Sequence, residues 1–147
     1  MKLTVSVTVP AARERLFAAL VDPAVLQRTI PGCEELLETG PDAYKARLKI
    51  GVAGLKGTYA GTAVVRDRQP PDSLTIAFDG KGSPGFVRGT AVLRLRPDAD
   101  RTHVDCDGEV QIGGLVAAVG SRLIEATARK LTDDFFRRLT DEMSDHP

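Results

Sequence analysis

The chain has 147 residues, the usual length of a single domain and enough to bury a hydrophobic core. Hydrophobic residues make up 42% of it, and its 20 basic and 20 acidic residues cancel. A neutral chain lacks the broad positive field that drives general nucleic-acid binding. We therefore expect one soluble domain over residues 1–147 that binds no nucleic acid.

The sequence shows no sign of a membrane span or of secretion. No apolar run comes near the roughly 20 residues that cross a bilayer. The first residues alternate in polarity instead of forming a signal-peptide core. Cys33 and Cys106 are too few for a disulfide framework, so we expect two small apolar thiols in a reducing compartment. The predicted location is the cytoplasm, with no transmembrane anchor.

The first elements in chain order are a strand and two short helices. Polarity alternates over residues 3–9, which predicts a half-buried strand that ends at Pro10. Apolar residues at helical spacing predict a helix over 11–20. Asp22 and Pro23 are typical of an N-cap and a first helical position, so a second helix is expected to run to about Thr29.

From Cys33 onward the polarity alternates with a period of two, and short turns rich in proline, aspartate or glycine interrupt it. Six more strands are predicted, over residues 33–38, 44–52, 58–67, 74–79, 86–96 and 103–112. Consecutive strands with short turns form an antiparallel meander. One face of these strands is apolar and must be covered.

A long helix over residues 115–143 is the predicted cover. Its apolar positions recur at helical spacing, and we expect them to face the sheet: Val116, Val119, Leu123, Thr127, Leu131, Phe135 and Leu139. The predicted fold class is α+β, with a curved antiparallel sheet of about seven strands around this helix.

Glycine is concentrated at one end of the predicted sheet. Strands that run in the same direction lead into residues 51–57, 80–85 and 113–114, so these glycine-rich exits are expected to lie together. Leu55, Phe86 and Leu115 are apolar residues on this rim. They either plug the core or form a flexible entrance to a cavity. Small residues on the apolar face favour a cavity, because they leave space: Ala46, Gly61, Ala63, Ala91 and Gly108.

Other motifs indicate no chemistry. The pattern at Gly80–Gly85 matches a dinucleotide fingerprint on paper, but a strand is predicted after it where the fingerprint needs a helix. The polar residues from His103 to Glu109 lie on one face of an extended strand, too far apart to share a metal ion. Tyr44 and Tyr59 lie on apolar faces, which favours packing or ligand contact over catalysis.

The sequence resembles the CoxG family of carbon monoxide dehydrogenase subunits, within the START/Bet v 1-like (SRPBCC) superfamily, over nearly its whole length. The resemblance implies the helix-grip fold of that superfamily. The segments that carry it are residues 9–11, 22–26, 30–33, 51–59 and 80–86, and most specifically 119–124, 128–131 and 135–136.

The resemblance implies an accessory role for a molybdenum-containing dehydrogenase of the carbon monoxide dehydrogenase type. Family members are linked to recruiting that enzyme to the inner membrane and to handling a lipophilic molecule such as a quinone. Some carry a C-terminal extension that reaches the membrane. This sequence ends at Pro147, directly after the long helix, so the anchor is not expected here, and any membrane contact would have to come from the Leu55 and Phe86 rim.

The leading hypothesis is a non-enzymatic protein that binds a quinone-like or isoprenoid-like ligand in an apolar cavity and needs no metal or catalytic residue. Tyr59 and Thr127 are the predicted polar contacts. Two alternatives are a protein-docking module with a solid core and a cyclase-like or hydratase-like enzyme of the same superfamily. The predicted ligand contacts are Leu48, Ile50, Tyr59, Phe78 and Leu93 on the sheet and Val116, Leu123 and Thr127 on the helix.

Overall fold

The computed structural model describes residues 1–51 and 55–145, and its elements follow the predicted order. The bounds are β1 (Lys2–Val9), α1 (Arg13–Leu20), α2 (Pro23–Thr29), β2 (Cys33–Gly40), β3 (Ala43–Ile50), β4 (Gly57–Gln69), β5 (Ser73–Gly82), β6 (Gly85–Asp98), β7 (Arg101–Gly113), a 3₁₀ helix η1 (Leu115–Val119) and α3 (Ser121–Asp145).

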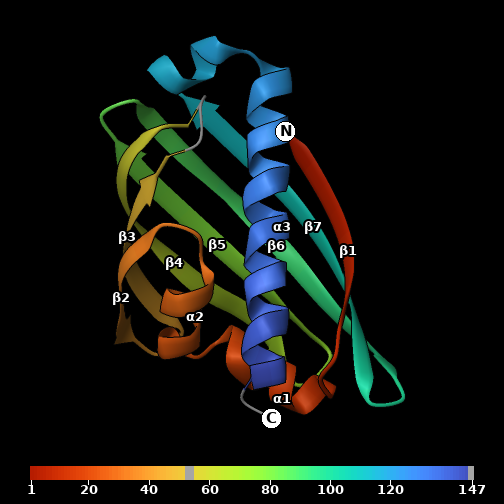
Figure 1. Ribbon diagram of the computed structural model, residues 1–147. Coiled ribbons are helices and arrows are strands. Elements are labelled where there is room, and N and C mark those ends of the chain that lie inside the picture. The colour runs from red at the N-terminus through yellow and green to blue at the C-terminus, as the bar shows by residue number, and fades with distance from the viewer. Residues whose placement is uncertain (52–54, 146–147) are drawn as a thin grey trace.

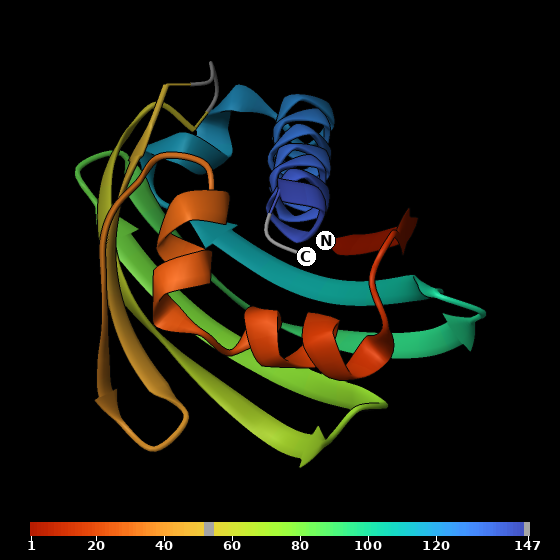
Figure 2. The same cartoon turned by 60° about the horizontal axis from the view of Figure 1, so that its bottom comes forward.

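The strands form one antiparallel sheet of seven strands in the order β1-β7-β6-β5-β4-β3-β2. β1 pairs with β7, and every other neighbour in the sheet is also a neighbour in the chain. The sheet curves around α3, which runs along its concave side (Figures 1 and 2). The predicted fold class is therefore confirmed.

Two short helices cover one end of the concave side (Figure 2). The Asp22 side chain accepts a hydrogen bond from the backbone N–H of Ala24 at 2.9 Å, and Pro23 opens α2, as predicted. The Tyr44 hydroxyl donates to the carbonyl of Val21 at 2.8 Å. This bond ties β3 to the junction of α1 and α2.

The long helix differs from its prediction in its start. The chain forms η1 first, and Gly120 then adopts a φ of 101°, which separates η1 from α3. Residues before Gly120 therefore do not share the helical phase of those after it. The predicted stripe is wrong at Val119 and Leu123, which are both 43% exposed, whereas Ile124 is buried.

The hydrophobic core is filled along the part of the sheet formed by β1, β7 and β6. Six inward residues of β1, β6 and β7 are at most 8% exposed: Leu3, Val5, Val9, Leu93, Leu95 and Val104. They form one hydrophobic cluster with residues of α1 and α3 that include Leu16 and Leu139. We call this side the packed half. The inward face of β3, β4 and β5 is the cavity half, described next.

Candidate ligand-binding cavity

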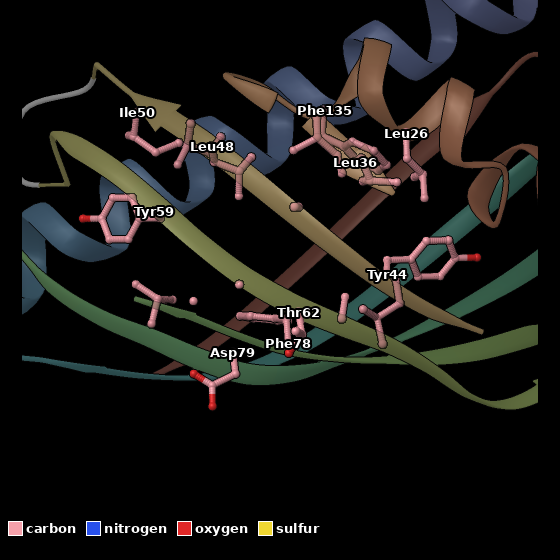
Figure 3. A pocket seen from close by; sticks show the side chains of 18 of the residues that line it. Leu26, Leu36, Tyr44, Leu48, Ile50, Tyr59, Thr62, Phe78, Asp79 and Phe135 are labelled. Atoms are coloured by element: carbon pink, nitrogen blue, oxygen red, sulfur yellow. The ribbon is translucent and has the colours of Figure 1, made fainter. Parts of the chain in front are cut away.

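A cavity of about 410 Å³ lies between the cavity half of the sheet and the helices α2 and α3. Its volume falls in the range of about 300–1,000 Å³ that is typical of small-molecule sites. The residues that line it are Leu20, Leu26, Ile30, Leu36, Tyr44, Ala46, Leu48, Ile50, Leu55, Tyr59, Gly61, Thr62, Ala63, Val65, Ile76, Phe78, Asp79, Gly80, Val87, Leu131 and Phe135. Figure 3 shows Ile50 and Tyr59 at one end and Leu26 and Tyr44 at the other.

Small side chains on β3 and β4 leave this space. Ala46, Gly61 and Ala63 all line the cavity, as their small size predicted. Gly61 is required by a close approach, because a Cβ there would lie 2.2 Å from the carbonyl oxygen of Asp79. Ala91 and Gly108 do not line the cavity, so among the small residues predicted to leave space only those on β3 and β4 border it.

The cavity wall is apolar. Its two polar lining residues other than the tyrosines, Thr62 and Asp79, are exposed to solvent on the outer face of the sheet. Figure 3 shows the Asp79 carboxylate directed away from the cavity. Within residues 1–51 and 55–145, no acid lines the cavity with its carboxylate directed inward, which is the arrangement that would have favoured an enzyme.

Both tyrosine hydroxyls already donate to backbone carbonyls. Tyr59 donates to the carbonyl of Leu55 at 3.0 Å, and Tyr44 donates to Val21 as described above. Burial is the main cause that raises the pKa of both phenols, so both stay protonated at neutral pH. Each hydroxyl can still accept a hydrogen bond, but its single proton is already donated to a backbone carbonyl.

The structure places four of the predicted contact residues on the cavity wall: Leu48, Ile50, Tyr59 and Phe78. Leu55 joins them. It was predicted on the rim, as a plug of the core or as part of an entrance, and it is 7% exposed and lines the cavity. Whether these side chains bind a ligand stays a prediction.

The other four predicted contacts do not line the cavity. Leu93 and Thr127 are buried, and Val116 is buried in η1. Leu93 belongs to the packed half, which α3 covers directly, and Leu123 is 43% exposed near the start of α3. On α3, the cavity wall is formed instead by Leu131 and Phe135.

The glycine-rich turns do meet at one end of the sheet. A Cβ on Gly57 would lie 2.8 Å from Pro84, and the carbonyl of Pro84 accepts a hydrogen bond from the Val116 N–H at 2.6 Å. Part of the first turn, residues 52–54, lies outside the described residues. Two of the predicted rim residues face away from the cavity. Phe86 lies under the Arg88 guanidinium on the outer face, 4.7 Å from ring centroid to Cζ, and Leu115 is 78% exposed.

The main residues that the sequence prediction missed come from α1, α2 and β2: Leu20, Leu26, Ile30 and Leu36. Their apolar character was visible, but no sequence signal shows which part of the concave face a short helix covers. Tyr44 and Ala46 could have been assigned, because they alternate with Leu48 and Ile50 on the same face of β3.

The Gly80–Gly85 motif and His103 lie where the sequence predicted them. Gly80–Gly85 leads into β6 and not into a helix. The His103 ring contacts the Thr8 hydroxyl at 2.7 Å and Asp98 at 3.0 Å, on the face of the sheet opposite to the core. Across the described residues there is no group of histidine, cysteine, aspartate and glutamate that could hold a metal ion. No helix in this part of the chain is long and apolar enough to cross a membrane.

A sheet that grips a long C-terminal helix around an apolar cavity defines a START/Bet v 1-like protein. The structure matches a START superfamily protein from Mycobacterium smegmatis with a TM-score of 0.79, at 12% identity over 99% of both chains. It also matches the Zhui aromatase/cyclase from a Streptomyces species with a TM-score of 0.71, at 21% identity over 98% of this chain and 93% of that one. At these identities the likeness concerns the fold alone.

The family model of the carbon monoxide dehydrogenase subunit CoxG matches residues 6–144. The chain belongs to this family. A conserved protein from Geobacillus kaustophilus is 34% identical, with a TM-score of 0.95 over 99% of this chain and 96% of that one. No curated protein matches the chain.

Proposed function

We propose that this protein is a non-enzymatic accessory protein of a molybdenum-containing dehydrogenase of the carbon monoxide dehydrogenase type, and that its cavity binds a lipophilic ligand such as a quinone. The observation that carries the proposal is the apolar cavity of about 410 Å³ in a member of the CoxG family. A docking module with a solid core does not fit this observation.

The apolar character of the cavity wall indicates which part of the proposed ligand it would bind. Apolar walls favour hydrocarbon, at about 25 cal/mol for each Å² removed from water. A quinone carbonyl needs a donor, yet the protons of Tyr44 and Tyr59 are bound to backbone carbonyls. The isoprenoid chain is therefore the part of the ligand that the cavity holds, and polar ring atoms contribute little affinity.

The tyrosines supply a direct assay. The chain has two tyrosines and no tryptophan, and both tyrosines line the cavity. Intrinsic fluorescence therefore reports on the cavity alone. Titration with a short-chain menaquinone is expected to quench it saturably, and the apolar extract of gently purified protein is expected to contain a lipophilic molecule by mass spectrometry.

A matched pair of variants tests the location. Ala63→Leu fills the cavity and is expected to weaken quinone binding at least tenfold. Ala60→Leu adds the same side chain to the exposed face of the same strand and is expected to leave binding unchanged. Equal quenching in both variants, or no ligand in the extract and no saturable quenching of the wild type, would refute the cavity proposal.

The partner is tested separately. The tagged chain is expected to co-purify with the subunits of a molybdenum-containing dehydrogenase from the same organism when they are expressed together. A dehydrogenase that elutes without the tagged chain would refute the accessory role and leave the ligand result untouched.

A further inference from the structure

The glycine-rich end of the cavity is closed by packing in the part of the chain that the structure describes. Leu55 and Tyr59 line the cavity there and are 7% and 6% exposed. The Tyr59 hydroxyl donates to the carbonyl of Leu55, and the Val116 N–H donates to that of Pro84. These bonds hold residue 55 against β4 and η1 against the turn between β5 and β6. The helical wall is therefore the other place where a small molecule could pass.

The helical wall of the cavity is a seam between two helices. Leu26 and Ile30, from α2 and its C-terminal end, lie on one side of the seam, and Leu131 and Phe135 of α3 lie on the other. All four are only partly buried, whereas Leu36 of β2, which lines the same cavity, is 7% exposed. Figure 3 shows Leu26 and Phe135 on the same side of the cavity. The seam is thus less tightly packed than the strand beside it.

The helix α2 is short, and both of its ends are fixed to β3. The Tyr44 hydroxyl donates to the carbonyl of Val21 just before the helix, and the Lys49 N–H donates to the carbonyl of Gly32 just after it, both at 2.8 Å. A helix of seven residues has little stability of its own, so its position depends on its contacts. The two bonds fix the ends of α2 and leave the side that faces α3 to be held by other contacts.

An ion pair holds that side of α2 to α3. The Nε atom of Arg28 lies 3.2 and 3.3 Å from the two carboxylate oxygens of Glu142, and Nη2 also contacts Oε1. Glu142 lies about two turns beyond Phe135 in α3. The Glu142 side chain is 11% exposed, and that of Arg28 is 55% exposed. The pair therefore spans the two helices at the surface of the protein, where salt can reach it.

We propose that α2 is a lid over the cavity, which pivots at Val21 and Gly32. The Arg28–Glu142 ion pair holds the lid closed, and small molecules pass between α2 and α3 when the pair breaks. A surface ion pair contributes little to stability, so it breaks and re-forms without unfolding the protein. The apolar side chains along the seam let a lipophilic molecule pass without desolvating a polar group. Passage of such a ligand rests on the proposed function, whereas the movement of α2 does not.

Acrylamide quenching of tyrosine fluorescence measures the opening without any lipophilic ligand. Both tyrosines line the cavity, and the chain has no tryptophan. Acrylamide is polar, so it reaches them only when the apolar wall opens. Glu142→Gln weakens the ion pair and is expected to raise the quenching rate constant about two- to fivefold, the effect of losing a surface ion pair. Arg28→Glu should raise it further, because two carboxylates then face each other.

Matched variants show whether the charge pair itself is responsible. Arg28→Glu combined with Glu142→Arg restores a pair of opposite charges and should return the quenching to the wild-type rate. Arg96→Gln is the control, since it breaks the 2.8 Å ion pair between Arg96 and Asp105 on the outer face of the sheet. It should be quenched like the wild type. Added salt should raise the quenching of the wild type toward that of Glu142→Gln, because salt screens the pair.

Amide hydrogen exchange locates the movement. In Glu142→Gln the amides of α2 are expected to exchange faster by the same factor as the quenching, while those of β6 and β7 keep their wild-type rates. Equal quenching of Glu142→Gln and the wild type would refute the lid. Faster quenching with unchanged exchange in α2, or a reversed pair that fails to restore the wild-type rate, would refute it as well. Thermal unfolding checks that each variant is folded.

The lid and the proposed ligand fail separately. With a short-chain menaquinone, Glu142→Gln should speed binding and release by the same factor and leave the dissociation constant unchanged, because the lid is closed in both the free and the bound protein. Faster acrylamide quenching without any quinone binding would refute the cavity ligand and keep the lid. Quinone exchange at the wild-type rates in Glu142→Gln would refute the lid and keep the ligand.

Discussion

The packed half and the cavity half belong to one sheet, yet their inward residues have different surroundings. Leu93 on β6 is 4% exposed in a continuous core, whereas Leu48 on β3 faces a void. α3 lies close to β1, where the Arg129 guanidinium donates to the carbonyl of Thr4 at 3.2 Å, and its side chains fill the space next to it. On the other side, the described helical residues that line the cavity come from α1, α2 and two positions of α3. We therefore expect stability to depend more on the packed half, and the proposed binding to depend on the cavity half.

The largest change in stability is expected when one leucine is removed from each half. Leu93→Ala should lower the free energy of unfolding by about 2–5 kcal/mol, because it opens a new cavity in a filled core. Leu48→Ala should cost less than about 2 kcal/mol, since it enlarges a space that already exists. Urea unfolding measures both. Equal losses would contradict the division into two halves.

Adding volume should act with opposite sign in the two halves. Ala63→Leu fills part of the void and should raise the free energy of unfolding by about 0.5–2 kcal/mol. Ala91→Leu forces the same atoms into the packed half and should lower it by about 1–3 kcal/mol. Thermal unfolding compares the two. A stabilising Ala91→Leu would show that the packed half also has spare volume.

The smallest effect concerns Cys106, in the packed half. Burial, aided by the charge of Asp107, raises its pKa from an ordinary 9.0 to about 11. Between these values the unfolded chain loses the thiol proton while the folded chain keeps it. Stability therefore falls as the pH rises from 9.0 to about 11, by about 1–2 kcal/mol.

Replacing Cys106 isolates this contribution from other groups that titrate in the same range. Cys106→Ala should show a flatter fall in stability over the same pH window. Cys33, on β2 beside the cavity half, donates its thiol to the carbonyl of Glu35, and burial also raises its pKa. Cys33→Ala should leave the pH dependence that Cys106 causes in place.

Much of the fold follows from local patterns. Alternation placed the strands, Asp22 and Pro23 placed the start of α2, and small residues on β3 and β4 indicated a void. The faces of Leu48, Ile50, Tyr59 and Phe78 were assigned from the same period of two. All of these depend on neighbours in the chain or on strands paired by short turns.

The errors came where position depends on packing between distant elements. Nothing local shows that α3 lies nearer to β1 than to β3, so Leu93 and Leu48 looked equivalent. The phase of the long helix depended on Gly120, because a glycine inside an apolar period can either continue a helix or end it. Here it separates η1 from α3, so Val116 and Val119 do not continue the helical positions of α3.

The hydroxyls of Tyr44 and Tyr59 donate to backbone carbonyls, and this limits which features of a ligand the cavity wall could distinguish. If the cavity binds a ligand as proposed, affinity should depend more on the length and bulk of the ligand than on its functional groups, because both tyrosine hydroxyls already donate their protons. Each methylene buried adds about 0.8 kcal/mol, which is close to a fourfold gain in affinity. In a homologous series of prenyl or alkyl compounds, affinity should therefore rise by a constant factor per carbon and then level off. The chain length at which it levels off would measure the depth of the cavity.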